Sequence, residues 1–229
     1  FNKALSTWNV SSVTNMSHMF SYESTFNQDL STWNVSSVTN MSHMFREASI
    51  FNQDISTWDV SAVTNMNQMF QDANSFNQDI SIWDVSAVTD MSYMFEDCSS
   101  LISLDVSFFN TSLVGDCAFF ISGCTSLTSL NFSGLDMTNV LQARNFANGC
   151  TNLEHINFTG TDFTANTNFN SFFANCTSLV CITNMYTLGT SSKTDMFLNT
   201  TSLLQPDAEA QALLAGIIDE DWTNGSACP

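Results

Sequence analysis

The chain has very few positive charges. Four Lys and Arg stand against 22 Asp and Glu in 229 residues, which gives a formal net charge of -18 at pH 7. A surface of this sign repels the phosphate backbone of nucleic acids. No apolar run approaches the roughly 18 residues that a membrane-spanning helix needs. The sequence therefore predicts no nucleic-acid partner and no membrane span.

Residues and motifs that carry chemistry are also scarce. The chain has two Pro, eight Gly and three His. It contains no Gly-rich phosphate loop, no nucleophile elbow and no specially spaced pair of carboxylates. His18 and His43 occupy equivalent positions that become Gln68 and Tyr93 further on, which does not suit a catalytic base. We expect no enzyme activity, no catalytic residue and no cofactor.

What the sequence has in abundance is repetition. Three sets recur every 25 residues: Phe1, Phe26, Phe51 and Phe76; Trp8, Trp33, Trp58 and Trp83; and Met19-Phe20, Met44-Phe45, Met69-Phe70 and Met94-Phe95. The spacing then becomes 26 residues, in Cys98, Cys124, Cys150 and Cys176. A unit of this size cannot bury its own apolar face, so it must stack on copies of itself. The sequence predicts a repeat solenoid of about eight rungs over residues 1–202.

The apolar spacing changes within each rung. Trp33 and Val35 alternate with polar neighbours, which predicts a short strand, and the apolar residues within 38–45 follow the spacing of one helical face. In the later rungs Leu127, Leu130 and Phe132 give the strand. Pro206 and the apolar stripe that follows it predict a further helix. We expect one short strand and one short helix in each 25–26-residue rung, and a C-terminal helical cap over residues 203–229.

The repeat resembles a known family. Residues 1–100 are similar to the FNQDISxWDVSxVTNMxxMF repeats of bacterial, mycoplasmal and algal surface proteins. AFFISGCTSLTSL, at residues 118–130, resembles the AFxxCxxLxxL unit of BspA-like leucine-rich-repeat proteins. The resemblance implies a leucine-rich-repeat-like solenoid in a secreted or cell-surface protein, often concerned with adhesion or surface structure. It implies no catalytic motif.

Seven Cys favour an oxidising, extracellular setting. Equivalent positions on adjacent rungs lie about 5 Å apart, which a disulfide can bridge, and buried free thiols are an equal alternative. The disulfide candidates are Cys98 with Cys124, Cys150 with Cys176, and Cys181 with Cys228, which leaves Cys117 over.

Ten Asn satisfy the N-x-S/T rule for glycosylation, against about six expected by chance in this composition. They are Asn9, Asn15, Asn34, Asn40, Asn110, Asn131, Asn157, Asn175, Asn199 and Asn224. Asn34 lies between two residues expected to face inward, so it should face solvent, as should Asn9. A secreted protein of eukaryotic origin would carry several glycans.

Aspartates recur in two columns. Asp29, Asp54 and Asp79 form one column, and Asp59 and Asp84 form another. Aligned carboxylates offer the hard oxygen ligands that calcium prefers. No loop matches a calcium motif, however, so solvated turns are the favoured interpretation over a calcium ladder.

The ends of the solenoid suggest a function. Phe1 is already the first consensus position of a rung, so Phe1 and Trp8 are expected at an uncovered end that either an upstream segment or another molecule covers. Head-to-tail docking of copies makes filaments. We expect an extracellular or cell-surface structural protein that self-assembles without catalysis. The alternative is a surface adhesin that recognises a protein or carbohydrate through the solenoid face, with irregular residues 108–120 as the expected place.

Overall fold

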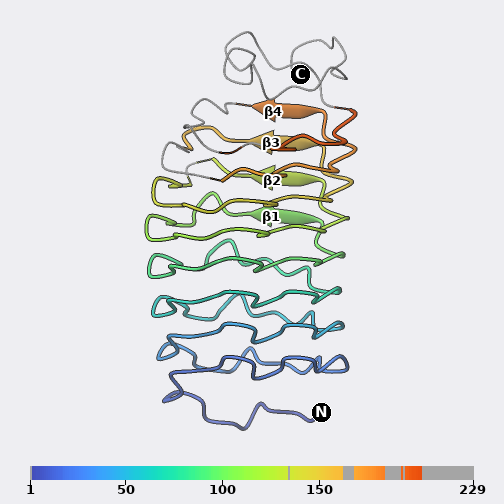
Figure 1. The fold of residues 1–229 in the computed structure, drawn as a ribbon. Coiled ribbons are helices and arrows are strands. Elements are labelled where there is room, and N and C mark those ends of the chain that lie inside the picture. Colours follow the sequence, from blue (N-terminus) through green and yellow to red (C-terminus); the bar gives the residue numbers. More distant parts are fainter. Residues whose placement is uncertain (1, 134, 162–167, 184–191, 193, 203–229) are drawn as a thin grey trace.

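The computed structural model describes residues 2–133, 135–161, 168–183, 192 and 194–202, in which the chain winds into a stack of rungs (Figure 1). Four short strands lie one above another as a parallel sheet in the order β1-β2-β3-β4. They are β1 (Ser103–Asp105), β2 (Ser129–Asn131), β3 (His155–Asn157) and β4 (Cys181–Thr183). Leu104 pairs with Leu130, and Leu130 with Ile156. The predicted repeat fold is confirmed at this level.

A second parallel ladder joins the rungs through single bridges. It links Asn15, Asn40, Asn65, Asp90, Asp116 and Gln142 in sequence. Just after each bridge, backbone N–H groups donate to carbonyls of the following rung: Met16 to Asn40 at 2.9 Å, His18 to Ser42 at 3.0 Å, Phe20 to Met44 at 2.9 Å and Tyr22 to Arg46 at 2.7 Å. Each of these four bonds leads to the following rung, whereas the Thr39 N–H, just before the Asn40 bridge, donates to the Thr14 carbonyl of the preceding rung at 2.8 Å.

The helix predicted in each rung is wrong. No helix occurs in the described part of the chain, and residues 42–47 form consecutive turns. His43 (φ 56°) and Glu47 (φ 57°) adopt the left-handed conformation, which a right-handed helix cannot contain. The Met41 N–H also donates to Asn65 of the next rung at 3.0 Å. The apolar periodicity reflects residues that point into the stack from turns, not from a helix.

The strand predicted at Trp33 and Val35 is also wrong, because that segment has no strand. At the positions next to which the later rungs have strands, the N-terminal rungs are joined by asparagine side chains: the Asn52 N–H donates to Asn27 Oδ1 at 3.0 Å, and the Asn77 N–H to Asn52 Oδ1 at 2.9 Å. In these bonds an asparagine side-chain oxygen accepts the hydrogen bond that a backbone carbonyl oxygen accepts in a strand.

The strand predicted in the later rungs is confirmed around Leu130, the central residue of β2. From Ile102 onward the backbone itself pairs, as in the 3.1 Å bond from the Thr128 N–H to the Ile102 carbonyl. Rungs of 26 residues have one residue more than rungs of 25, and Leu104 in β1 occupies the added position. The longer rung therefore has room for a short strand.

Aromatic columns fill the interior of the stack. Phe45 stacks on Phe70 at 5.6 Å between ring centroids, and Phe70 on Phe95 at 5.5 Å. Trp58 is buried, and its Nε1–H donates to the Leu30 carbonyl of the preceding rung at 3.2 Å. Burying the ring while satisfying its polar atom makes tryptophan stable at this position.

The cap predicted over residues 203–229 lies outside the described residues, as do Phe1 and Lys193. The division into a solenoid over 1–202 and a cap therefore remains a prediction. In the described part of the chain, no helix is long and apolar enough to cross a membrane.

Candidate functional site

A series of tight turns forms one edge of the stack. In each turn the N–H of the last residue, which is aromatic in the first five rungs, donates to a carbonyl three residues earlier, as from Trp83 to Ile80 at 3.0 Å and from Phe109 to Val106 at 2.9 Å. The first and last residues of these turns are buried, except for Trp8 in the first rung, which is half exposed. The two central residues are therefore held at the surface by their anchored neighbours.

Both predicted aspartate columns lie beside these turns, and we call the whole the aspartate edge. It comprises Asp29, Asp54, Asp79 and Asp105, then Asp59 and Asp84, with the turn residues Thr7, Thr32, Thr57, Ile82 and Phe108. Each of these aspartates is exposed and accepts a hydrogen bond from the N–H two residues later, as Asp79 does from Ser81 at 2.9 Å.

Serine hydrogen bonds favour the ionised form of Asp29, Asp54, Asp79 and Asp84. The Ser81 backbone N–H, then its hydroxyl, lowers the pKa of Asp79, and the Ser86 hydroxyl, then its N–H, lowers the pKa of Asp84. In the part of the chain that the structure describes, no group of three or more His, Cys, Asp or Glu side chains could hold a metal ion. The aspartate columns are serine-capped turns, and no calcium-binding cluster forms along them.

Two apolar side chains interrupt this polar edge. Ile82 is 76% exposed and Phe108 is 80% exposed, at the turn position that is threonine in the first three rungs. Phe108 lies in the irregular stretch expected to carry a binding surface. Ile82 was missed, although its departure from threonine was a signal in the sequence.

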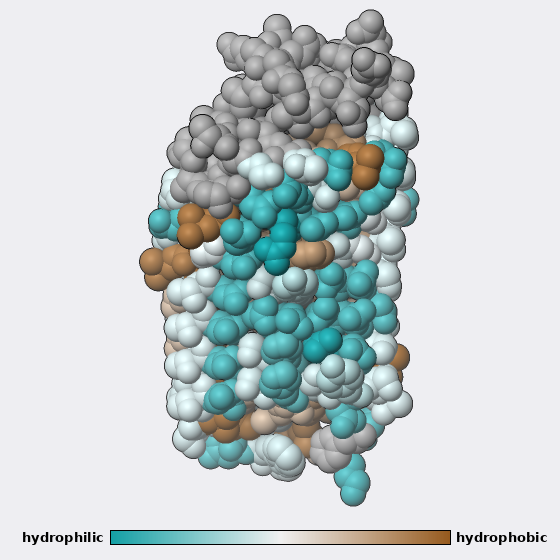
Figure 2. Space-filling model, viewed as in Figure 1, coloured by the Kyte–Doolittle hydropathy of each residue, from teal (hydrophilic) through white to brown (hydrophobic). Residues whose placement is uncertain are grey.

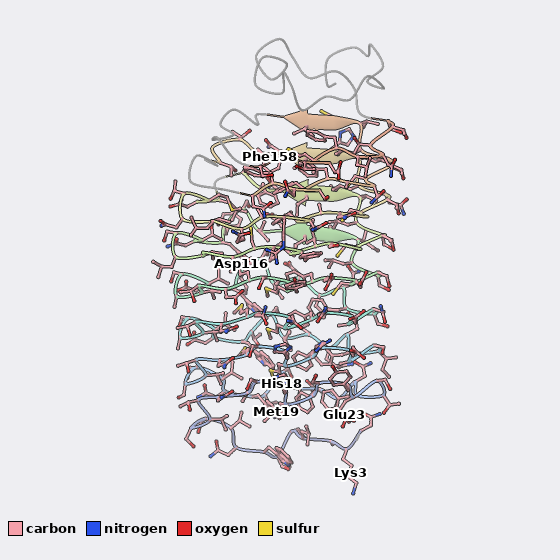
Figure 3. The ribbon with its side chains drawn as sticks, in the orientation of Figure 1. Lys3, His18, Met19, Glu23, Asp116 and Phe158 are labelled. Atoms are coloured by element: carbon pink, nitrogen blue, oxygen red, sulfur yellow. The ribbon has the colours of Figure 1, made fainter. Side chains whose placement is uncertain are left out.

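The end of the rod near the N-terminus also exposes apolar surface (Figure 2). Trp8 is 51% exposed, whereas Trp33 on the next rung is 4% exposed. The two indoles stack at 6.5 Å with an angle of 8° between their planes. Lys3 projects from this end (Figure 3). Of the two predicted assembly-end residues, Trp8 presents its ring to solvent, and Phe1 lies outside the described residues.

A column of left-handed residues carries His18 and His43, whose rings stack at 4.3 Å. Burial, then the nearby His18 ring, lowers the pKa of His43. Arg46 lies 5.3 Å from the centroid of the Tyr22 ring and 3.7 Å from the Glu47 carboxylate. Nothing in the sequence pattern predicts the left-handed backbone of this column, because these residues are not glycine.

The same side of the rungs carries Glu96. Burial raises its pKa to about 6, while a hydrogen bond from the Gln71 amide acts in the opposite direction. The distance from Gln71 Nε2 to Glu96 Oε2 is 2.5 Å. Burial also raises the pKa of the neighbouring Asp97. Glu96 therefore lies beside the Gln71 amide and near the carboxylates of Asp72 and Asp97.

The predicted disulfides between rungs do not form, because Cys98, Cys124, Cys150 and Cys176 are buried free thiols. Each Sγ instead donates to a backbone carbonyl, as from Cys124 to Phe95 at 3.1 Å. Burial raises the pKa of the Cys98 thiol and raises that of Cys176 to about 12. Cys117 is also free. The predicted partner of Cys181, Cys228, lies outside the described residues.

The predicted glycosylation sites fall into different environments. Asn9, Asn15, Asn34, Asn110, Asn157 and Asn199 are exposed, Asn40, Asn131 and Asn175 are partly buried, and Asn224 lies outside the described residues. Asn9 and Asn34 face solvent, as expected. The Asn175 Nδ2 donates to Asn148 Oδ1 at 2.9 Å, so a glycan on Asn175 would disrupt this contact.

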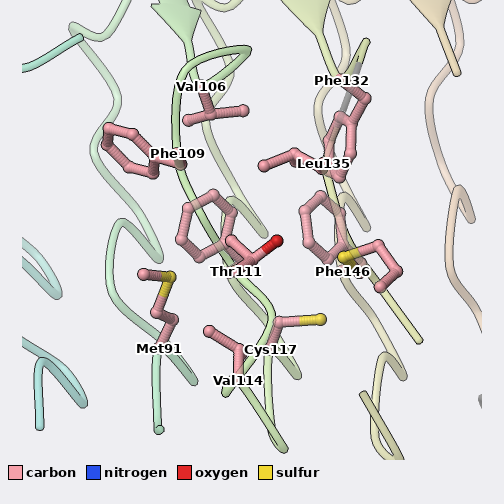
Figure 4. Close-up of a pocket in the computed structure, with 11 residues that line it drawn as sticks. Met91, Val106, Phe109, Thr111, Val114, Cys117, Phe132, Leu135 and Phe146 are labelled. Atoms are coloured by element: carbon pink, nitrogen blue, oxygen red, sulfur yellow. The ribbon is translucent and has the colours of Figure 1, made fainter. Parts of the chain in front are cut away.

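A small apolar cavity lies inside the stack where the rung length changes (Figure 4). Met91, Val106, Phe109, Cys117 and Leu135 are among its lining residues. Phe109 and Leu135 stand where earlier rungs have tryptophan, and the smaller side chains leave the space unfilled. Thr111 also lines the cavity, but Thr111 Oγ1 donates to the Asp136 carbonyl and Cys117 Sγ to the Gln142 carbonyl, so neither group is directed at a substrate.

Stacked rungs joined by parallel ladders define the chain as a repeat protein. A family model described as "Mycoplasma protein of unknown function, DUF285" matches residues 1–104 and again residues 100–209. The two matches cover most of the chain, which therefore belongs to this family. No curated protein matches the sequence.

Proposed function

We propose that the chain is an extracellular or cell-surface structural protein, a leucine-rich-repeat-like rod of the BspA-like kind, that assembles head to tail without catalysis. The half-exposed Trp8 carries this proposal. Its equivalents on later rungs are buried because another rung lies on each side of them. A rung laid against Trp8 would bury the ring in the same way, whether it belongs to the same polypeptide or to another molecule.

The direction of the rungs favours head-to-tail over head-to-head contact. Both ladders are parallel, and their N–H groups donate to both neighbouring rungs, as from Met16 to Asn40 of the following rung and from Thr39 to Thr14 of the preceding rung. A rung that joins one end by the same parallel pairing must run in the same direction as the rungs already stacked, which two copies achieve only by joining opposite ends. Repeated head-to-tail contacts do not close and produce filaments.

The charge distribution disfavours contact between the sides of two rods. The net charge is -18, and the aspartate edge repeats a carboxylate on rung after rung. Like charges on facing surfaces repel, and salt weakens that repulsion. Apolar end contacts should therefore be strengthened, not weakened, by salt.

The surface location rests on resemblance and composition. The repeat is similar to repeats of bacterial, mycoplasmal and algal surface proteins. Exposed sequons such as Asn9 and Asn34 suit a secreted chain if the source glycosylates proteins. The presence of glycans is tested by measuring the intact mass of the protein from its native source before and after enzymatic glycan removal. An unchanged mass would contradict the proposal that the protein is glycosylated.

End-to-end assembly is tested by comparing Trp8→Glu with Thr32→Glu. Both substitutions add one negative charge at an exposed residue, but only Trp8 lies on the end surface. We expect the wild-type chain and Thr32→Glu to form elongating rods with rising concentration, seen by sedimentation velocity and electron microscopy, and Trp8→Glu to stay as single particles. Single particles for all three, or rods for all three, would contradict the proposal.

A second candidate function is a binding module that recognises a partner through the side of the solenoid. One observation favours it: Ile82 and Phe108 break the threonine column with exposed apolar side chains. Recognition needs features that a uniform repeat lacks, and these two residues supply them.

A further inference from the structure

Ile82 and Phe108 occupy corresponding positions of two adjacent turns. Asp79 and Ser81 of one rung line the same shallow groove as Leu104 and Asp105 of the next. The rungs of a parallel ladder lie about 4.8 Å apart. The two apolar side chains are therefore neighbours along the aspartate edge, close enough for one bound segment to cover both. Adjacent exposed apolar side chains with a polar rim are typical of an interaction surface.

The surroundings of this apolar pair are strongly acidic. Asp79 and Asp84 flank Ile82 in sequence, and Asp105 precedes Phe108 by three residues. Residues 47–143 contain twelve Asp and Glu and no Lys, Arg or His. The chain therefore supplies no basic side chain of its own from these rungs to neutralise the edge. A partner with Lys or Arg side chains would gain a favourable charge interaction with each aspartate that it meets along this edge.

We propose that the aspartate edge at Ile82 and Phe108 binds an extended, basic polypeptide segment of a different protein. Apolar side chains of the segment cover Ile82 and Phe108, and its Lys and Arg side chains pair with Asp79, Asp84 and Asp105. The inference rests on the second candidate function and does not depend on end-to-end assembly.

The chemistry of the surface selects this occupant. A second copy of the chain would place like charges against each other, and nucleic acids or anionic lipids would be repelled. An arginine can also lie over the face of an exposed phenylalanine. The same molecule already shows this contact, because Arg144 lies 5.7 Å from the centroid of the Phe119 ring.

The test uses titration calorimetry of the full chain with an octapeptide of alternating Arg and Leu. Two control peptides replace every Arg with Glu, or every Leu with Ser. The key variant is Ile82→Thr/Phe108→Thr, which restores the residue that the first three rungs have at this position and so should fold. Ile50→Thr is the matched control, because Ile50 is an exposed isoleucine on a different turn.

We expect the Arg-Leu peptide to bind, and the binding to weaken with added salt. The Ile82→Thr/Phe108→Thr variant should bind at least about tenfold more weakly, as expected when apolar anchors are lost, and Ile50→Thr should bind like the wild type. Absence of binding, equal binding by the double variant, an equal loss in Ile50→Thr, or binding of the Glu-Leu peptide would overturn the proposal. So would binding of a neutral dextran in place of the peptide.

Assembly is measured separately on the same variants. Ile82→Thr/Phe108→Thr should form rods as the wild type does, because neither residue lies on the end surface. Loss of peptide binding with intact rod formation would therefore support the aspartate edge as the peptide-binding surface. If the wild-type chain forms no rods but binds the peptide as expected, only the proposed end-to-end assembly is contradicted.

Discussion

The tryptophan column shows how one residue type behaves differently with its place in the stack. Trp58 is buried between neighbouring rungs and donates its indole N–H to Leu30 at 3.2 Å, whereas Trp8 is half exposed. Burial gives an apolar side chain most of its stabilising effect, so the same substitution should have unequal costs at the two positions.

Replacing Trp58 with Ala should lower the free energy of unfolding by about 3–5 kcal/mol, because it leaves a cavity and removes the indole hydrogen bond to the Leu30 carbonyl. Trp8→Ala should cost less than half as much, since solvent already reaches that ring. Urea unfolding followed by circular dichroism measures both. Equal losses at the two positions would contradict the burial pattern.

Glu96 gives the protein an unusual pH response. Burial raises its pKa to about 6, above the ordinary value of 4.5, so the folded state binds a proton that the unfolded state releases between these two values. Stability should therefore fall as pH rises from 4.5 to 6 and then level off. The half-buried carboxyl is screened by solvent, which limits the effect to less than about 1 kcal/mol.

The substitution Glu96→Gln should remove this fall and make the protein more stable at pH 7. Thermal unfolding at several pH values measures the change. Asp97 should retain a smaller fall of the same sign, because burial raises its pKa as well. A variant that loses stability at pH 7 would show that the ionised carboxylate is stabilising, contrary to expectation.

At the scale of the element, the sequence predicted the stacking but not the backbone. The 25-residue period placed Trp33 and Phe45 correctly inside the stack. The helix was predicted because residues that point inward from a run of turns can share the spacing of a helical face. The left-handed residues that set this path, His43 and Glu47, are not glycine, so composition gave no signal for them.

The sequence also predicted only some features of the candidate surfaces. The uncovered Trp8 could be expected from the repeat, and Phe108 from its departure from the repeat. The hydrogen bonds between Asp79 and Ser81 required coordinates, because they depend on the shape of the turn. The thiols could not be assigned from spacing alone, since rung spacing permits both a disulfide and a pair of free thiols.

The change in rung length leaves an apolar cavity. The residues at equivalent positions of earlier rungs suggest a substitution that would fill it. Val106 lines it and stands where the preceding rungs have Ile55 and Ile80. Val106→Ile adds one methyl group to the cavity and should stabilise the fold by up to about 0.8 kcal/mol.

The reverse change, Ile80→Val in a filled rung, should cost about 0.5–1.5 kcal/mol. Chemical denaturation of both variants against the wild type measures the pair. A loss of stability in Val106→Ile would mean that the space cannot accept a methyl group without strain.

At the scale of the whole molecule, the two ends of the rod differ, and exposed apolar side chains lie both at an end and along a side. Its rungs all run in the same direction through parallel ladders, and its exposed apolar side chains include Trp8 at one end and Ile82 and Phe108 on the aspartate edge. The first property favours head-to-tail contact between rods, and the second separates assembly from recognition. One protein could therefore form a filament and still bind partners along its side.

The rung stacking is measured most simply by distances between spin labels at equivalent turn residues. Cysteines introduced at Ser24 and Thr125 are four rungs apart, and those at Ser24 and Thr177 are six rungs apart, so electron double resonance should give about 19 Å and about 29 Å. The native thiols at Cys98, Cys124, Cys150 and Cys176 are buried and should resist labelling. A separation that fails to grow in proportion to the number of rungs would contradict the stacked rod.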